Sequence, residues 1–219
     1  VISPWAKDME FIFKGFEKSI CNLSEWQSAL DYLIINSIYP HIKISINRFS
    51  IDKNYFLNSG LEEVSLSTLD GLVLKSWLKR PKSQDGYTIL IFHGNGGHVG
   101  HRINKFESFI DEGYGLFFLE YRGYADNPGK PSETGLYNDA LAAIKFLSDN
   151  NLKTNKIILY GESLGCGIAV KLSTESEYAA TILEAPYTSI NDVAQKHYWY
   201  LPAKWLVLDK YNIIDKINK

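Results

Sequence analysis

Residues 161–165 read GESLG and follow directly on the apolar run 157–160 (IILY). The apolar run predicts a buried strand, and residues 166–173 predict a helix. A serine at a strand-to-helix junction, with a glycine two positions away on each side, is typical of a nucleophile elbow, because only small neighbours leave room for the strained turn. The sequence therefore predicts that Ser163 is the nucleophile of a serine hydrolase.

A second glycine-rich stretch lies one strand–helix–strand–helix unit upstream. Residues 93–97 read HGNGG and follow the apolar run 87–92, which predicts a central strand. In a fold with a nucleophile elbow, this loop supplies one backbone N–H to the oxyanion hole, and the residue after the nucleophile supplies the other. These donors are predicted to be the N–H groups of Asn95 and Leu164.

Strand and helix patterns alternate from residue 62 onward. Strands are expected at 63–68, 72–78, 87–92, 115–121, 157–160 and 179–184, with a tight turn at Asp70-Gly71 between the first two. Helices are expected at 103–111, after residue 132, where Leu136, Ala140, Ile144 and Leu147 share one face, and at 164–174. This alternation predicts the α/β class, with a mostly parallel sheet and helices on both faces.

Composition excludes several classes of function. Among 219 residues, 45% are hydrophobic and 22% charged, with a net charge of −2, which gives no basis for nucleic-acid binding. No run reaches the roughly 18 apolar residues that a membrane span requires. Two cysteines, Cys21 and Cys166, form no disulfide framework, so a reducing, cytoplasmic setting is expected.

Two units are expected along the chain. Residues 1–55 are interpreted as an aromatic-rich, partly helical N-terminal extension, with a helical segment that Pro40 ends. Residues 56–219 are interpreted as the α/β domain, ending in a cap-like aromatic region around 195–205.

Two other interpretations of the glycine-rich loop are weaker. Gly94 and Gly96 after a strand, with Glu120 ending the next strand, imitate a dinucleotide-binding fingerprint, but Val99 stands where its third glycine belongs. The nearby histidines, His93, His98 and His101, have no cysteine and no closely spaced carboxylate beside them, so no metal site is expected. His93 is interpreted as a brace of its loop and the other two as solvated. No cofactor is expected.

Several motifs in one order carry a family resemblance over about residues 60–219. They are HGNGG at 93–97, YRGY at 121–124, PSE at 131–133 with Gly135 and Asp139, GESLG at 161–165, and LE at 183–184 with TS at 188–189. Together they resemble the α/β-hydrolase-domain subfamily that includes the Bem-type proteins and the protein depalmitoylases, within the serine-aminopeptidase-like grouping.

This resemblance implies a Ser-Asp-His triad on an eight-stranded, mostly parallel sheet. Ser163 would be the nucleophile, while Arg122 is interpreted as a brace of its loop. In the family the acid follows strand 7 and the histidine strand 8, so we expect a C-terminally truncated hydrolase that lacks these two strands. Within the chain, Asp192 or Glu184 with His197 would satisfy the order serine, acid, histidine, but the preferred interpretation is that His197 is a cap residue.

The function expected from the sequence is a serine hydrolase of esterase or thioesterase type that forms an acyl-enzyme on a small-molecule or acylated substrate. The alternative is a non-catalytic or decayed α/β-hydrolase-fold protein that serves as a binding module or is a gene fragment. Residues 179–184 would form an exposed, apolar sheet edge. We expect the chain to be poorly soluble or to associate with itself there, unless residues 190–219 fold back over the edge.

Overall fold

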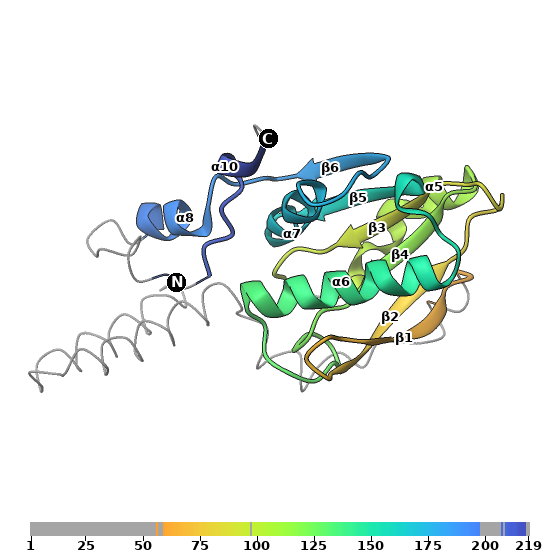
Figure 1. The fold of residues 1–219 in the computed structure, drawn as a ribbon, viewed down its shortest axis with the longest axis horizontal. Helices are drawn as coiled ribbons and strands as arrows, with labels where there is room; N and C mark the ends of the chain where they lie inside the picture. The colour runs from red at the N-terminus through yellow and green to blue at the C-terminus, as the bar shows by residue number, and fades with distance from the viewer. Residues whose placement is uncertain (1–55, 57–58, 97, 198–206, 208, 218–219) are drawn as a thin grey trace, which may run out of the picture.

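The apolar runs of the sequence build a mixed sheet at the centre of the fold, as the computed structural model shows (Figure 1). The structure describes residues 56, 59–96, 98–197, 207 and 209–217. Within these, six strands lie in the order β1-β2-β4-β3-β5-β6. They are β1 (Glu62–Ser67), β2 (Val73–Lys79), β3 (Thr88–Phe92), β4 (Gly115–Leu119), β5 (Ile157–Glu162) and β6 (Ala180–Glu184). β1, β2 and β4 pair antiparallel, whereas β4, β3, β5 and β6 are parallel.

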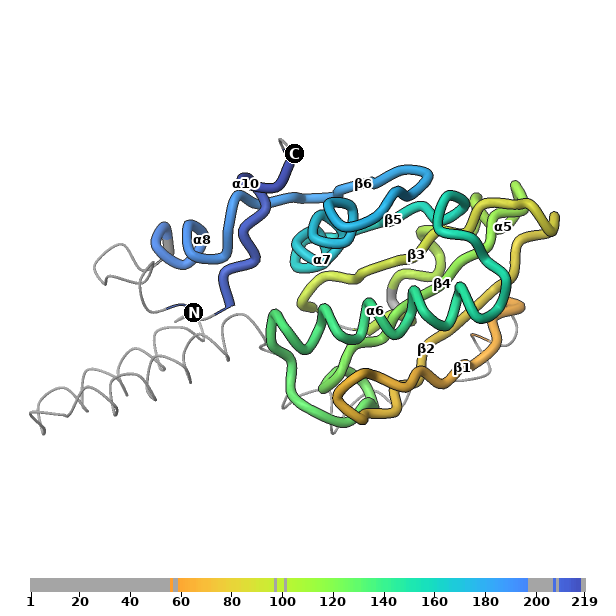
Figure 2. The backbone as a smooth tube through the Cα atoms, in the orientation of Figure 1, coloured from red at the N-terminus to blue at the C-terminus, as the bar shows by residue number. Residues whose placement is uncertain are grey.

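Helical segments connect the parallel strands. The 3₁₀ segment η1 (Val99–Phe106) continues into α5 (Glu107–Asp111), and α6 (Glu133–Asp149) leads through η2 (Thr154–Lys156) to β5. α7 (Leu164–Ser173) follows β5, and α8 (Ile190–His197) and α10 (Ile214–Ile217) follow β6. Figure 2 traces this order along the backbone and shows α6 and α7 on the near side of the sheet.

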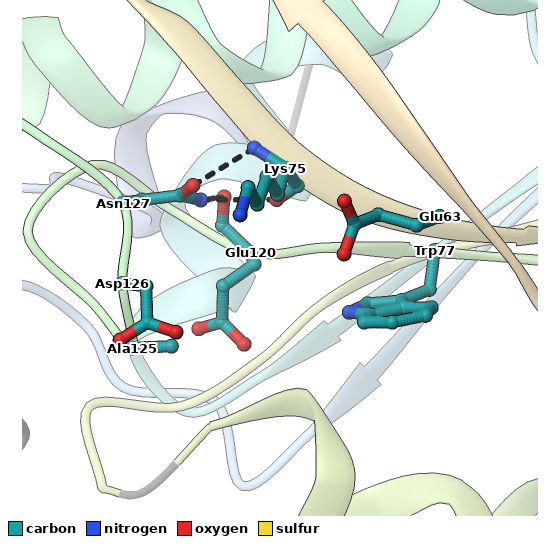
Figure 3. A pocket seen from close by; sticks show the side chains of 7 residues that line it. All are labelled: Glu63, Lys75, Trp77, Glu120, Ala125, Asp126 and Asn127. Atoms are coloured by element: carbon teal, nitrogen blue, oxygen red, sulfur yellow. Dashed lines mark hydrogen bonds between the residues drawn. The ribbon is translucent and has the colours of Figure 1, made fainter. Parts of the chain in front are cut away.

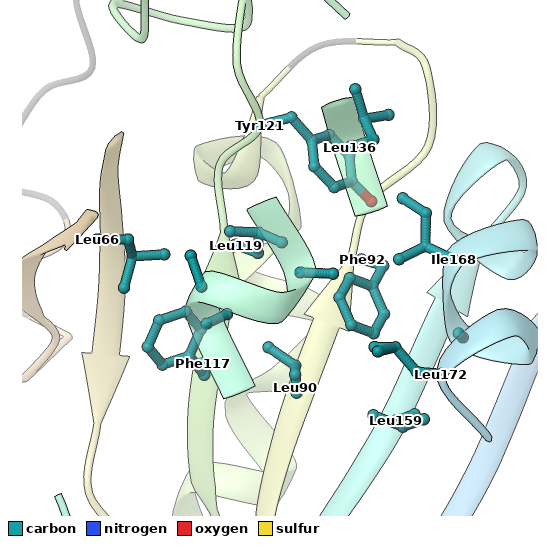
Figure 4. Packing of buried hydrophobic residues seen from close by; sticks show 14 of the residues in the cluster. Leu66, Leu90, Phe92, Phe117, Leu119, Tyr121, Leu136, Leu159, Ile168 and Leu172 are labelled. Carbon is teal, nitrogen blue, oxygen red and sulfur yellow. The ribbon is translucent and has the colours of Figure 1, made fainter. Parts of the chain in front are cut away.

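Side chains alternate between two apolar cores because successive residues of a strand point to opposite faces. On one face, Leu90 and Phe92 of β3 pack with residues of α6 and α7, such as Leu136 and Ile168 (Figure 4). On the other face, Ile89 and Ile91 pack with the η1–α5 segment. β3 and β4 are buried along their whole length. The expected α/β class, with helices on both faces of a mostly parallel sheet, is confirmed.

Local sequence signals set the turns and helix ends. The β1–β2 hairpin turns at Asp70-Gly71, where Gly71 has φ +87° and donates its N–H to the Thr68 carbonyl at 3.1 Å. α6 begins after Ser132, whose hydroxyl accepts the N–H of Gly135 at 3.0 Å, and an acidic residue stands in its first turn. This is the capping chemistry that serine provides at a helix start.

The register of the parallel ladder positions the candidate site. Phe92, the last residue of β3, pairs with Gly161 of β5, so the loops after these two strands leave the sheet side by side. The chain turns from β3 toward β4 in one direction and reaches β5 on the opposite side of β3. Such a switch point, outside the carboxyl ends of parallel strands, is where open α/β sheets bind ligands.

Some expectations differ from the structure or lie outside it. The helix expected at 103–111 begins earlier, at Val99, and its first part is a 3₁₀ helix, because His98 caps it by accepting the N–H of Gly100 at 3.1 Å. Among the described strands β6 has β5 as its one neighbour, and Ile182 on it is 40% exposed; self-association at this edge stays a prediction. The extension at 1–55 lies outside the described residues. Within the part described, no helix combines the length and apolarity needed to cross a bilayer.

Candidate active site

Ser163 stands alone between β5 and α7 in a strained backbone conformation. Its φ of 49° and ψ of −111° lie outside the regions that side chains favour, and such a residue costs on the order of 1–3 kcal/mol. Two backbone contacts hold the turn, because the Ser163 N–H donates to the Glu184 carbonyl and the Cys166 N–H donates to the Ser163 carbonyl, both at 2.9 Å. Ser163 is exposed although Gly161, Leu164 and Gly165 around it are buried.

The two glycines of GESLG are there for steric reasons. A Cβ on Gly165 would lie 2.0 Å from the carbonyl oxygen of Phe92, and one on Gly161 would lie 2.7 Å from the Cα of Cys166. Any side chain at either position would push α7 away from the ends of β3 and β5. The close approach of α7 to the sheet therefore depends on both glycines.

The loop after β3 reaches this serine. A Cβ on Gly94 would lie 3.4 Å from the Cβ of Ser163 and 3.0 Å from Oε1 of Glu162. Asn95 is the next residue in the chain after Gly94. Leu164 is the first residue of α7, and a helix leaves its first N–H groups without an acceptor of its own. The structure thus brings the Gly94 backbone close to Ser163 at the start of α7, and the oxyanion roles of Asn95 and Leu164 stay a prediction.

Aromatic side chains from the β4–α6 loop hold the 93–95 segment in place. The hydroxyl of Tyr124 donates to Oδ1 of Asn95 at 2.8 Å, and the hydroxyl of Tyr121 donates to the carbonyl of His93 at 3.2 Å. Nδ1 of the fully buried His93 lies 2.7 Å from the Gly94 carbonyl, and its Nε2 lies 3.3 Å from Oε1 of Glu120. His93 is therefore a brace of its loop, as the sequence suggests.

Charged side chains form a second network beside Ser163. Arg102 of η1 donates to both carboxylate oxygens of Glu162, at 2.9 Å each, and Lys105 pairs with Glu184, which also accepts from the hydroxyl of Tyr160. Burial acts to raise the pKa of Glu162, but the hydrogen bonds and charge of Arg102 outweigh it and hold that pKa below its usual value. Lys105, as the main cause, also lowers the pKa of Glu184. Sequence reasoning missed this network, since its members lie up to 79 residues apart.

The other glycine-loop interpretations gain no support from the geometry. Glu120, which a dinucleotide site would need at the ribose, is buried and accepts the Val99 N–H at 3.0 Å. His98 is buried and caps η1. The expectation that it is solvated was wrong, because its ring accepts the N–H of Gly100 at the start of η1. Within the described part of the chain, no group of three or more metal-ligating side chains comes together.

Cys166 is not a rival nucleophile. Its thiol donates to the carbonyl of Gly161 at 3.1 Å and is fully buried. Burial raises the pKa of this thiol to about 11. At neutral pH it is therefore a thiol and not the reactive thiolate.

Of the acid and base that the sequence suggests within this chain, the structure describes the side chain of Asp192 but not that of His197. Asp192 lies in the first turn of α8, where its Oδ2 accepts the hydroxyl of Thr188 at 3.0 Å. His197 is the last residue of α8, and its side chain lies outside the described set. α8 lies on the side toward which β6 points (Figure 1). Glu184, the other acid considered, has its carboxylate bonded to Lys105 and Tyr160.

Arg122 ties the β4–α6 loop to distant parts of the fold. Its guanidinium donates to both oxygens of Asp70 in the β1–β2 turn and to Oδ1 of the buried Asp139 in α6 at 2.8 Å. Its backbone N–H donates to the other oxygen of Asp139 at 2.9 Å. These contacts make Arg122 a brace, as the sequence interpretation holds.

A small pocket lies beyond the end of the β2–β4 pairing, which stops at Trp77 and Phe118 (Figure 3). Asn127 bridges the gap there, because its amide bonds both backbone groups of Lys75 and the carbonyl of Glu120. The pocket holds about 20 Å³, which is room for about one water molecule. Its lining is Glu63, Lys75, Trp77, Glu120, Ala125, Asp126 and Asn127.

A strained, exposed serine between a parallel strand and a helix, beside a glycine-rich loop, is the arrangement of α/β hydrolases. The family model for serine aminopeptidase, S33, matches residues 84–210. The chain belongs to this family of α/β hydrolases.

Curated relatives from distant organisms match well over half of this chain. An uncharacterized protein of Mycobacterium tuberculosis is 36% identical over 157 residues, covering 71% of this chain and 56% of its own length. Protein bem46 of Schizosaccharomyces pombe is 32% identical, covering 71% and 54%. Lysophosphatidylserine lipase ABHD12 of Xenopus tropicalis is 33% identical, covering 61% and 38%. The chain spans about half the length, or less, of these relatives.

Solved structures show the same fold. An α-β hydrolase from Vibrio vulnificus superposes with a TM-score of 0.69 at 21% identity, covering 91% of this chain and 72% of that one. An esterase from Pyrococcus furiosus superposes with a TM-score of 0.59 at 20% identity, covering 74% and 67%. The α/β-hydrolase fold and the family expected from the sequence motifs are thereby confirmed.

Proposed function

We propose that this chain carries the nucleophile and the oxyanion hole of a serine hydrolase that cleaves acyl esters or thioesters. The observation that supports this most is the position of Ser163, which is exposed on a strained turn and faces the Gly94 segment at the end of β3. Strain of this kind persists where the surrounding structure enforces it, and it is concentrated at functional sites. An esterase among the similar folds and a lysophosphatidylserine lipase among the relatives agree with an ester substrate.

The proposed reaction follows from these positions. Oγ of Ser163 attacks the acyl carbonyl carbon while its proton passes to a base, and the oxygen of the tetrahedral intermediate takes the negative charge. The N–H groups of Asn95 and Leu164 donate to that oxygen. The proton then goes to the departing alcohol or thiol, and water hydrolyses the acyl-enzyme to a carboxylic acid.

Within this chain the candidate for the base is His197, with Asp192 or Glu184 as the candidate acid. His197 is the one histidine after Ser163 in the sequence, and both residues lie on α8. The rival source of the base is a histidine in residues that follow Lys219 in a longer protein, as the greater length of the relatives allows. The coding sequence downstream of Lys219 is the direct way to look for that histidine.

The test is hydrolysis of p-nitrophenyl acetate and butyrate by the folded chain. Ser163→Ala is expected to lower the rate by about a thousandfold or more, and Ser173→Ala, at the far end of α7, is the matched control. An equal loss in His197→Ala would assign the base to this chain, whereas an unchanged rate would assign it elsewhere. A folded wild-type chain without Ser163-dependent hydrolysis would favour the non-catalytic binding role.

A further inference from the structure

One guanidinium bonds the segments on both sides of the candidate site. Nε and Nη2 of Arg102 donate to the two carboxylate oxygens of Glu162, and Nη2 also donates to the carbonyl of Gly96 at 2.8 Å. Nη1 donates to the carbonyl of His98 at 3.1 Å. The Arg102 side chain is 11% exposed. Its hydrogen-bonding groups are therefore committed to the protein.

The partners of Arg102 are immediate neighbours of the reacting groups. Glu162 directly precedes Ser163, and Gly96 directly follows Asn95. Oε1 of Glu162 and Nη2 of Arg102 both lie within 3.5 Å of where a Cβ on Gly94 would stand. Arg102 thus fixes the separation between the nucleophile turn and the loop that carries the proposed oxyanion donor.

The same contacts also offset the negative charge of Glu162 beside Ser163. A carboxylate one residue from Ser163 would repel the negative oxygen that forms during attack, most strongly in a site screened from water. The bidentate bond to Arg102 neutralises that carboxylate and holds it in a fixed geometry, as arginine does better than lysine. Loss of Arg102 would therefore release the loop and leave the Glu162 carboxylate with only the longer contact to Lys105, at 4.0 Å.

We propose that Arg102 is a positioning residue for catalysis. It fixes the loop of residues 93–96 against Ser163 through its bonds to Gly96 and Glu162. This inference rests on the proposed serine hydrolase function. It extends that function to a residue of η1, more than sixty positions before the nucleophile.

Three variants separate the bracing role of Arg102 from its effect on charge. Arg102→Gln removes both effects, and Arg102→Gln with Glu162→Gln restores neutrality without restoring the brace. Arg102→Lys keeps the charge but loses the bidentate bond. The matched control is Arg80→Gln, since Arg80 is half exposed and bonds Asn150 and Glu62 at the surface.

The first measurement is the kcat and KM of the 219-residue chain toward p-nitrophenyl butyrate. Loss of a fixed oxyanion donor acts in the transition state, so Arg102→Gln should lower kcat at least about tenfold with little change in KM. The double variant should recover part of this loss, and Arg102→Lys should fall between wild type and Arg102→Gln. Unchanged kcat in Arg102→Gln would overturn the proposal.

The second measurement is amide hydrogen exchange, which does not depend on activity. Arg102→Gln should speed exchange of the segment 93–96 and leave α6 unchanged, whereas Arg80→Gln should alter neither. Unchanged exchange at 93–96 would overturn the brace even in an active enzyme. Exchange at 93–96 could also be faster in Arg102→Gln when the folded wild-type chain shows no hydrolysis that depends on Ser163. That result would support the bracing role of Arg102 and contradict the proposed hydrolase function.

Discussion

Gly165 and Phe92 are in contact across the end of the sheet, and a Cβ on Gly165 would lie 2.0 Å from the Phe92 carbonyl oxygen. The contact joins the first turn of α7 to the last residue of β3, whose partner in β5 is Gly161. The nucleophile turn and the loop that begins at His93 thus share one rigid support. Backbone packing, as well as side-chain hydrogen bonds, therefore sets the position of the turn relative to the loop.

This contact predicts that Gly165→Ala is strongly destabilising. The neighbour is backbone and cannot move aside, so the variant should lose about 3 kcal/mol or more of unfolding free energy. Gly71→Ala is the control, because a Cβ there meets nothing within 4 Å and only the positive φ opposes it, at a cost of about 1 kcal/mol. Urea unfolding measures both. Equal losses in the two variants would show that α7 does not need this close approach.

Tyr124→Phe should weaken catalysis more than stability. It removes the hydroxyl that holds Oδ1 of Asn95, a bond worth about 1 kcal/mol of stability. If that bond also orients the Asn95 N–H, kcat should fall several-fold while KM stays within twofold. Tyr137→Phe, whose hydroxyl bonds Glu175 at the surface, is the matched control. Equal kcat values for both variants would contradict an aligning role of Tyr124.

Arg122→Met should unfold the domain more easily without acting on Ser163 directly. The change leaves the fully buried Asp139 without its charged partner, although the backbone N–H of residue 122 still bonds it, and breaking a buried ion pair in this way costs about 3–5 kcal/mol. The exposed Arg80→Met should cost less than about 1 kcal/mol. Thermal melts compare the two, and hydrolysis below the melting range should persist in Arg122→Met. A wild-type melting temperature in Arg122→Met would refute the bracing role.

Acid should destabilise the fold through carboxylates whose pKa is lowered on folding. The hydrogen bond from Arg122 holds the pKa of Asp70 well below its usual range, and Lys105 lowers that of Glu184. In the unfolded chain these groups have pKa values of about 4. As the pH falls, these carboxylates therefore bind protons in the unfolded chain before they do so in the folded chain. Their contribution to the free energy of unfolding is complete above about pH 5 and is lost below about pH 4, as the pH approaches the folded pKa values.

Urea midpoints between pH 7 and pH 3 test this dependence. The midpoint should be flat down to about pH 5 and then decline, and Asp70→Asn should make the decline shallower. A midpoint that rises as the pH falls toward 3 would contradict the assignment of these carboxylates as groups stabilised in the folded state.

The sequence predicts the fold well because apolar runs and glycine spacings are local signals. All six described strands and the turn at Ser163 lie within a residue or two of the expected positions. What the sequence does not reveal is tertiary: Arg102 and Glu162 are far apart in the chain and carry no shared pattern. Likewise His98, polar and next to a glycine-rich loop, gives no sign that its ring is buried as a helix cap.

Covalent labelling of Ser163 tests the central claim most directly. The folded chain would be treated with a fluorophosphonate, and the adduct would be located by peptide mass spectrometry in wild type, Ser163→Ala and the control Ser173→Ala. The account predicts one adduct, on the peptide containing Ser163, that disappears in Ser163→Ala and persists in Ser173→Ala. A folded chain that carries no adduct at Ser163, or labelling that is unchanged in Ser163→Ala, would contradict it.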